Sequence, residues 1–215
     1  MSETTRDHIL AACARVISRA GLTGFRMSDV AREAGVSIGL LPYHFGDRDG
    51  LLQAALDHVN EGTADRAARI PSASSPGGRL EALLCSEFGE EAAIREGSIA
   101  WNELRAKAVF SPAQADAVAR STGRWQAEAR ALIAEAAPDR DADALALILT
   151  ALVEGLSGRW LTGQISSAAA QEAVRDALSG LGFSARDGGG DDDGADPHSA
   201  PRLTCTASTP EAQEQ

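Results

Sequence analysis

Glycine and proline divide this chain into short segments, and that punctuation limits the possible folds more than any other feature. Between the breaks the sequence is rich in Ala, Leu, Glu and Arg, which favour helix. No stretch alternates apolar and polar residues with the period of two that a half-buried strand shows. The sequence therefore predicts an all-α fold with about nine helices. The breaks lie at residues 21–24, 35–37, 46–47, 71–78, 111–112, 138–139 and 163–167.

The first helix is predicted from an apolar stripe that ends at Gly21, and the next three are predicted from their ends. Ser28 is the expected N-cap of the second helix, which Gly35 ends in the left-handed conformation. Ser37 is the expected N-cap of the third, and Asp47 that of the fourth, which should run to about residue 70. Five more helices are expected at about 78–95, 97–110, 112–137, 140–162 and 167–182. The stripe of the first helix comprises Ile9, Leu10, Cys13, Val16, Ile17 and Ala20.

These segments group into two expected domains, at residues 3–63 and 76–182. Residues 184–215 are polar, acidic and rich in Gly and Pro, so we expect a disordered tail that is solvated or, alternatively, mimics DNA. The formal net charge of −11 argues against a protein that coats nucleic acid with a broad basic surface. Residues 1–60 nevertheless carry six arginines against seven acidic residues. A DNA contact made by a few well-placed groups is compatible with this balance.

Several functional classes lack a supporting pattern. Cys13, Cys85 and Cys205 are widely spaced, so we expect buried or loose thiols rather than a metal site or a disulfide framework. No nucleophile–base pair, metal-ligand spacing or phosphate-binding glycine loop is found, so the sequence predicts no enzyme, cofactor or metal. No apolar run approaches the roughly 20 residues of a membrane helix, and the N-terminus lacks a signal-peptide block. A cytoplasmic protein without membrane contact is expected.

Residues 26–45 carry the pattern that points most directly to a function. A short helix, a turn containing Gly35 and a second short helix form a helix-turn-helix pattern. Ala31 is small where the two helices would cross, and Val36 is expected to fill the core beneath the turn. In this motif the second helix lies in the major groove, with its N-terminal residues at base edges. The pattern predicts a DNA-binding protein.

The stretch RMSDVAREAGVSIGLLPYHFGDRDGLL resembles the DNA-binding signature of the tetracycline-repressor (TetR) family of transcriptional regulators. The matching features are DVAREAGVS in the second helix, the YHF ending of the third and DRDGLL at the start of the fourth. This resemblance spans about residues 5–60. The stretches IAWNELRAKAVFSP and LTALVEGLSGRWLTGQIS extend it, less strongly, to about residue 182, where the chain resembles the subgroup of the betaine-pathway repressor BetI.

The resemblance implies a set of DNA contacts. Arg26 and Ser28 would bind phosphates near the start of the second helix. Tyr43 and His44 would bind phosphates from the wall of the groove, with a core or capping role as the alternative for the histidine. Arg48 would reach the DNA backbone. The residues nearest the bases would be Ser37, Ile38, Gly39 and Leu40, whose apolar members would contact thymine methyl groups or be ordinary surface residues.

Pro42 departs from the family pattern, because many members have a phosphate-binding tyrosine there. This chain places its aromatic residue at Tyr43 instead. With Ser37 as the N-cap, Pro42 would remove one backbone hydrogen bond, to Ile38, in the last turn of a short helix. The loss would lie beyond the residues that read bases.

The C-terminal half is expected to hold an effector pocket and a dimer interface. The pocket is implied by the resemblance, and tryptophans near acids such as Glu87, Glu91 and Glu103 would suit a cationic ligand; the alternative is that these tryptophans only fill the core. The pocket candidates are Phe88, Trp101, Asn102, Arg105, Phe110, Trp125 and Glu154. Apolar stripes on the last two helices would form a four-helix bundle between two subunits or would face the subunit's own core. They comprise Leu149, Leu152, Leu156, Trp160, Val174, Leu178 and Leu181.

Together these features predict a ligand-responsive repressor that binds a palindromic operator as a homodimer. A small-molecule effector, cationic or amphipathic, would release it by shifting the fourth helix and so the DNA-binding heads. A dimeric helical interaction protein with a degenerate DNA-binding head is the alternative.

Overall fold

The computed structural model describes residues 3–69 and 75–183, and its regular structure is entirely helical in these ranges. The all-α prediction is confirmed. The predicted acidic tail and Cys205 lie outside the described residues. The helices are α1 (Glu3–Gly24), α2 (Met27–Glu33), α3 (Leu40–Phe45), α4 (Arg48–Ala68), α5 (Pro76–Cys85), α6 (Ala92–Ala108), α7 (Pro112–Ala136), α8 (Ala142–Leu161) and α9 (Ser167–Gly180).

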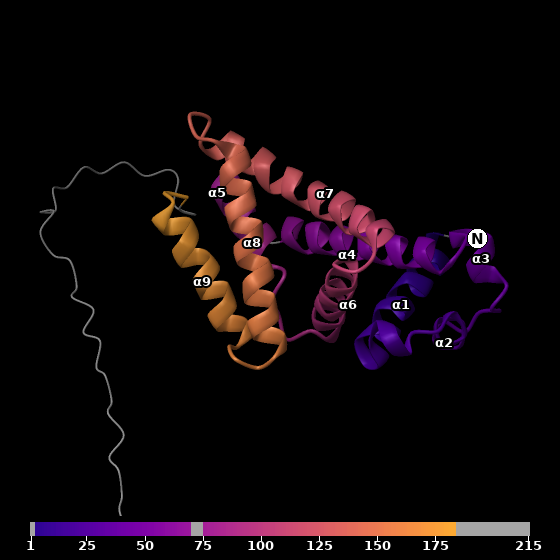
Figure 1. Cartoon of the computed structure of the whole chain (residues 1–215). Helices are drawn as coiled ribbons and strands as arrows, with labels where there is room; N and C mark the ends of the chain where they lie inside the picture. The colour runs from indigo at the N-terminus through magenta and orange to yellow at the C-terminus, as the bar shows by residue number, and fades with distance from the viewer. Residues whose placement is uncertain (1–2, 70–74, 184–215) are drawn as a thin grey trace, which may run out of the picture.

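The helices form an elongated body with two hydrophobic cores. Figure 1 shows α1, α2 and α3 at one end and α8 and α9 at the other, with α4 and α7 running between them. The first core joins α1–α4 and takes in Ala100 and Leu104 of α6. The second core joins the end of α4 with α5, α7, α8 and α9. Both ends of the molecule therefore have a core of their own. Each fully buried Leu or Ile in these cores stabilises the fold by about 1.5–3 kcal/mol through its removal from water.

Capping residues explain several helix starts. The Asp47 carboxylate accepts a hydrogen bond from the Gly50 N–H at 2.8 Å, which confirms the predicted N-cap of α4. Ser75, Asp141 and Ser166 cap α5, α8 and α9 in the same way. Pro76 opens α5 at a position where a missing N–H costs no helical hydrogen bond.

Two predicted caps are wrong. The extended residue Arg26 precedes α2, so Ser28 lies inside the first turn of that helix and does not cap it. The third helix begins at Leu40 after a turn in which the Leu40 N–H bonds the Ser37 carbonyl, and no side chain caps it. Because α3 starts later than predicted, Pro42 is its third residue and lies in its first turn. The first four N–H groups of a helix lack intrahelical partners, so Pro42 removes no hydrogen bond from α3.

The predicted helices at 78–95 and 97–110 have wrong boundaries. The chain leaves helix after Cys85 and re-enters it at Ala92, so the break lies several residues before residue 96, where the predicted boundaries place it. Gly97 is inside α6, where a Cβ atom would lie 3.1 Å from Val59 of α4. That glycine permits a close helix–helix approach rather than ending a helix.

The expectation that no segment is long and apolar enough to cross a membrane is wrong for α8 on length and composition. The helix has a mean hydropathy of 1.4 over its best window, and 44% of that window is buried in the molecule. It packs against α7, α9, α6 and α5, as the core helix of a water-soluble protein does.

Candidate nucleic-acid interface and central cavity

The segment from α2 to α3 has the geometry of a helix-turn-helix. Gly35 adopts φ 65°, the left-handed conformation predicted for it. The Val36 N–H bonds the Ala31 carbonyl at 2.9 Å and the Gly35 N–H bonds the Arg32 carbonyl at 3.2 Å, which is a Schellman ending. Ala31 is 4% exposed, and Val36 packs against the core as expected. These local bonds fix the direction in which the chain enters α3.

Most of the predicted DNA contacts lie on the surface. Ile38 is 57% exposed and Tyr43 is 80% exposed, while the completely buried Leu41 anchors α3 to the core. Such exposure of two large apolar side chains leaves them available for a partner. Arg26, Ser28, Ser37 and Gly39 are also exposed, and Leu40 is half-buried.

His44 and Arg48 are less available than the resemblance implies. The His44 ring is half-buried and meets the Tyr43 ring edge-on, with 4.7 Å between centroids. The Arg48 guanidinium donates to the Leu22 carbonyl at 3.2 Å and lies over the Phe25 ring at 5.3 Å. In this structure Arg48 therefore joins α4 to the end of α1.

Ion pairs hold several arginines of the DNA-binding end. Arg15 and Arg19 both contact the Glu33 carboxylate, at 2.9 and 3.1 Å, and their hydrogen bonds hold its pKa below its ordinary value. Arg32 pairs with Asp29 at 2.7 Å. Arg26 is exposed, and no ion pair to it is found among the described residues. The surface near the motif thus offers few cations, as the charge balance predicted.

A central cavity lies between α4, α6, α7 and α8. Three predicted pocket residues, Trp101, Trp125 and Glu154, line it. Its open volume is about 20 Å³, room for about one water molecule. The buried indole N–H of Trp125 has no hydrogen-bond acceptor among the described residues. The other lining residues are Val59, Asn60, Glu87, Ser98, Val153 and Ser157.

Glu87 supplies a second carboxylate to this cavity. Burial raises its pKa to about 7, against the opposing effects of the nearby Arg66 charge and a hydrogen bond from Thr63. The same residue also lines an open groove of about 250 Å³ between α1, α4 and α6. Of the three acids expected near the tryptophans, only Glu87 lines the cavity: Glu91 precedes α6 on the surface, and Glu103 faces α1.

The remaining pocket candidates have other roles. Phe88 is 1% exposed and packs edge-on against Trp160 in the second core, with 5.8 Å between centroids. Phe110 is 84% exposed, so its placement in a pocket is wrong. Asn102 donates to the Ser157 hydroxyl at 3.0 Å, and Arg105 pairs with Glu154 at 2.6 Å. These two contacts join α6 to α8 beside the cavity.

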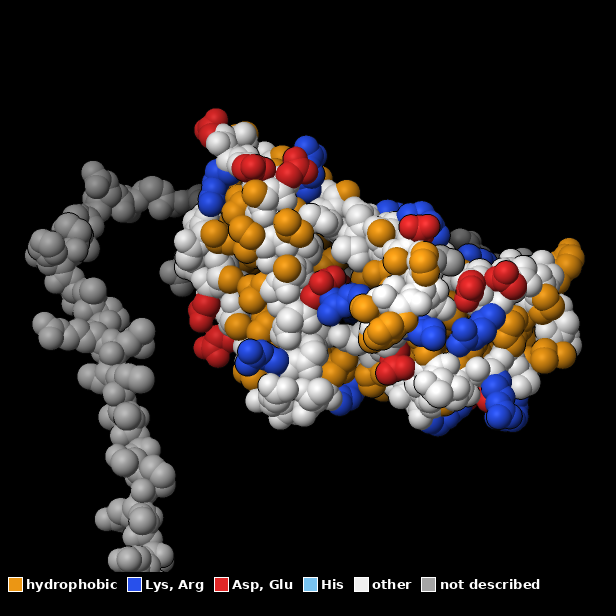
Figure 2. Space-filling view, viewed as in Figure 1, with side chains coloured by type: hydrophobic (Ala, Val, Ile, Leu, Met, Phe, Trp, Pro, Cys, Tyr) orange, Lys and Arg blue, Asp and Glu red, His pale blue; other side chains and the backbone are white. Residues whose placement is uncertain are grey.

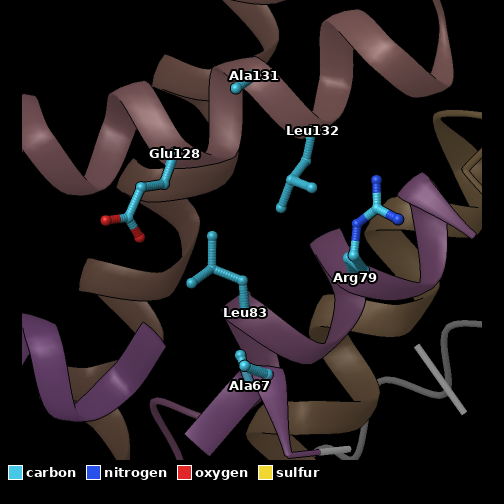
Figure 3. Close-up of a pocket in the computed structure, with 7 residues that line it drawn as sticks. Ala67, Arg79, Leu83, Glu128, Ala131 and Leu132 are labelled. Carbon is cyan, nitrogen blue, oxygen red and sulfur yellow. The ribbon is translucent and has the colours of Figure 1, made fainter. Parts of the chain in front are cut away.

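A larger groove of about 480 Å³ lies between α4, α5 and α7, and no predicted pocket residue lines it. Figure 3 shows Leu83 and Leu132 facing each other across it, with Glu128 and Arg79 on opposite sides. Burial raises the pKa of Glu128, opposed by the Arg124 charge. The lining of this groove is rich in alanine, and no sequence pattern predicted the groove.

The predicted dimer stripe is largely internal. Leu149, Trp160, Val174 and Leu178 are at most 5% exposed and belong to the second core, so they cannot also meet a partner subunit. Leu152, Leu156 and Leu181 are half-buried. The outer face of α8 instead presents Leu147 and Ile148, 59% and 55% exposed, with the exposed Ala151 one turn further on. Figure 2 shows hydrophobic side chains gathered on the surface over α8.

The two cysteines in the described ranges are buried and free, as expected. Burial raises the pKa of Cys13 to about 12 and that of Cys85 to about 11, so neither is a reactive thiolate at neutral pH. No group of metal-ligating side chains is found in residues 3–69 and 75–183.

Comparisons with known proteins agree with these features. Residues 9–55 match the family described as bacterial regulatory proteins, tetR family, and residues 76–182 match the BetI-type transcriptional repressor C-terminal family. The HTH-type transcriptional regulator BetI of Burkholderia thailandensis is 31% identical over 168 residues, which cover 77% of this chain and 85% of that protein.

Two solved structures are similar over most of the chain. A putative TetR-family transcriptional regulator from Rhodococcus sp. is 42% identical with a TM-score of 0.80, over 86% of this chain and all of the other. A putative transcriptional regulator from Saccharomonospora viridis, solved in complex with choline, is 27% identical with a TM-score of 0.68, over 83% of this chain and 97% of the other. The helix-turn-helix, the second helical core and these similarities lead to one conclusion: the chain belongs to the TetR family of DNA-binding transcriptional regulators, which are not enzymes, and carries a BetI-type C-terminal domain.

Proposed function

We propose that this protein is a ligand-responsive repressor that binds a palindromic operator as a homodimer and is released by a small organic cation. The observation that carries this proposal is the central cavity. It places two tryptophans and two carboxylates, Glu87 and Glu154, beside α4 and α6, the two lining helices that are part of the core of the DNA-binding end. A cytoplasmic location follows from the operator as target.

The cavity chemistry favours a cation that also has a hydrogen-bonding group. Tryptophan faces attract organic cations, and a nearby carboxylate adds charge complementarity. The unpartnered indole N–H of Trp125 would be satisfied by a hydroxyl or carboxylate oxygen of the ligand. The choline complex of the Saccharomonospora viridis relative supports this class of ligand. Because the open volume of the cavity is only about 20 Å³, ligand entry requires it to expand, which would move the surrounding helices.

The exposed residues around α3 support DNA binding by a small set of contacts. Ser37, Ile38 and Gly39 precede α3 on the surface, where this motif reads bases. Tyr43 and Arg26 are free to approach phosphates, whereas Arg48 would have to leave its contact with Leu22 to do so. Because few cationic side chains lie near the motif, the affinity for DNA should depend strongly on these few groups.

The outer face of α8 supports dimer formation. Leu147, Ile148 and Ala151 recur at helical spacing on one exposed face, beside the half-buried Leu152. Two such faces related by a two-fold axis would bury these side chains together and place two heads on one operator.

Selection of binding sequences from random DNA tests the proposal. The full-length protein should enrich a palindrome whose half-sites lie about one helical turn apart, and binding should weaken steeply with salt. Addition of choline should lower the affinity for the selected DNA. Equal affinity for selected and random DNA, with or without choline, would contradict the proposal and favour an interaction protein with a degenerate head.

A further inference from the structure

Helix α6 is attached both to the cavity and to the DNA-binding end. Toward the cavity it presents Ser98 and Trp101, and it is joined to α8 through Asn102 and Arg105. On its other side Ala100 and Leu104, 2% and 3% exposed, are part of the core of α1–α4. Helix α1 packs against α6 more extensively than against any other helix.

At the end of α1, individual hydrogen bonds connect this helix to α6 and α4. Gly21 interrupts the helix with φ 62° and ψ 174°, so the following peptide leaves the helical hydrogen-bond pattern. The Leu22 N–H instead donates to the Glu103 carboxylate of α6 at 2.9 Å. The Leu22 carbonyl accepts from Arg48 of α4 at 3.2 Å. Both polar groups of this residue, which is 7% exposed, are therefore held by side chains from other helices.

The contact between Glu103 and the Leu22 N–H also explains why residue 21 is a glycine. A Cβ atom at residue 21 would lie 3.2 Å from the Glu103 carboxylate oxygen, and the positive φ already disfavours any other residue. Four residues beyond, Phe25 is buried beneath the Arg48 guanidinium, and the extended residue Arg26 then precedes α2. The clamped peptide thus sets where the helix-turn-helix starts.

We propose that Glu103 is a positioning residue that transmits movement of α6 to the helix-turn-helix, by clamping the Leu22 peptide together with Arg48. The signal from the cavity then runs through α6 as well as through α4. Helix α4 is the one whose movement is predicted from the sequence. A ligand that pushes on Trp101 shifts the helix that carries Glu103, and the α1–α2 joint follows. This inference rests on the proposed ligand response, which the experiment separates from the clamp itself.

The first measurement is amide hydrogen exchange at Leu22 in the full-length protein. A hydrogen bond to a charged group contributes enough that E103A should lower protection of this amide by about 10- to 100-fold. E103Q keeps an acceptor oxygen and should retain most of the protection. Lys107→Ala, on the exposed surface of the same helix, is the matched control and should leave Leu22 unchanged. Unchanged protection in E103A overturns the clamp whatever the DNA result.

The second measurement compares DNA affinity with and without choline, using the sequence selected by the wild-type protein. E103A should bind choline with an affinity within about twofold of wild type, because Glu103 does not line the cavity. Its DNA affinity should respond to choline at least about fivefold less. A full response in E103A overturns the signalling role and leaves the proposed function intact. A wild-type protein that selects no sequence overturns the proposed function and the signalling role together, whereas loss of Leu22 protection in E103A would still establish the clamp as a structural joint.

Discussion

The strongest prediction concerns the pH dependence of cation binding at Glu87. The pKa of this carboxyl is raised to about 7 by burial in the unliganded protein, and a bound organic cation would favour the ionised form. For a pKa of 7, about 9% of the sites are ionised at pH 6 and about 91% at pH 8. If only the ionised form binds, the affinity for choline should rise by about tenfold across this range, which is about 1.4 kcal/mol.

Calorimetric titration of the full-length protein with choline at pH 6, 7 and 8 measures this rise directly. Glu87→Gln should bind weakly with no pH dependence between these values. The charged groups around the site are Arg66, whose effect opposes the shift, Glu128, which adds to it, and Glu154, which also lines the cavity and pairs with Arg105 at 2.6 Å. If the affinity of Glu87→Gln for choline still rises between pH 6 and pH 8, another group titrates, and the assignment of the pH dependence to Glu87 is refuted.

The same shift predicts the pH dependence of stability. Since the folded-state pKa lies above the ordinary 4.5, Glu87 stabilises the fold fully below about pH 4.5. That contribution is lost as the pH rises through about 7, so thermal denaturation of wild type should show a decline that Glu87→Gln lacks.

Three further predictions concern the surface and the joint of α3 with α4. Ile148→Asp should prevent the proposed dimer from forming in light-scattering measurements, because it places a charge on the apolar face of α8, whereas the control Val109→Asp, 77% exposed at the end of α6, should not. Tyr43→Ala should leave thermal stability within about 0.5 kcal/mol and weaken operator binding by about tenfold in gel-shift titrations; unchanged binding would remove Tyr43 from the interface. Gly50→Ala should destabilise the fold by about 1–3 kcal/mol in chemical denaturation, because its Cβ would lie 2.0 Å from the Phe45 carbonyl oxygen, while Gly123→Ala, with open space around it, should be neutral or stabilising.

The helix-turn-helix was predictable because its determinants are local. Gly35, the small Ala31 and the capping Asp47 act within a few residues of themselves, so their spacing already specifies a turn and a helix start. The error at Pro42 arose from the missing cap: α3 begins at Leu40 rather than directly after the predicted N-cap Ser37, and only the structure shows that the proline lies in the first turn.

The sequence by itself determined an all-α chain and its family, since these follow from local periodicity and from motifs within single segments. The two tryptophans of the cavity were implied only by the family resemblance, with core filling as the alternative. Tertiary structure decided what depends on residues far apart in the chain. It turned the predicted stripe of α8 and α9 inward, because a helix with an apolar surface on two sides can bury only one of them within its own subunit. It also paired Glu103 with the Leu22 peptide, 81 residues away, because a broken helix leaves a backbone N–H that must find an acceptor wherever another helix supplies one.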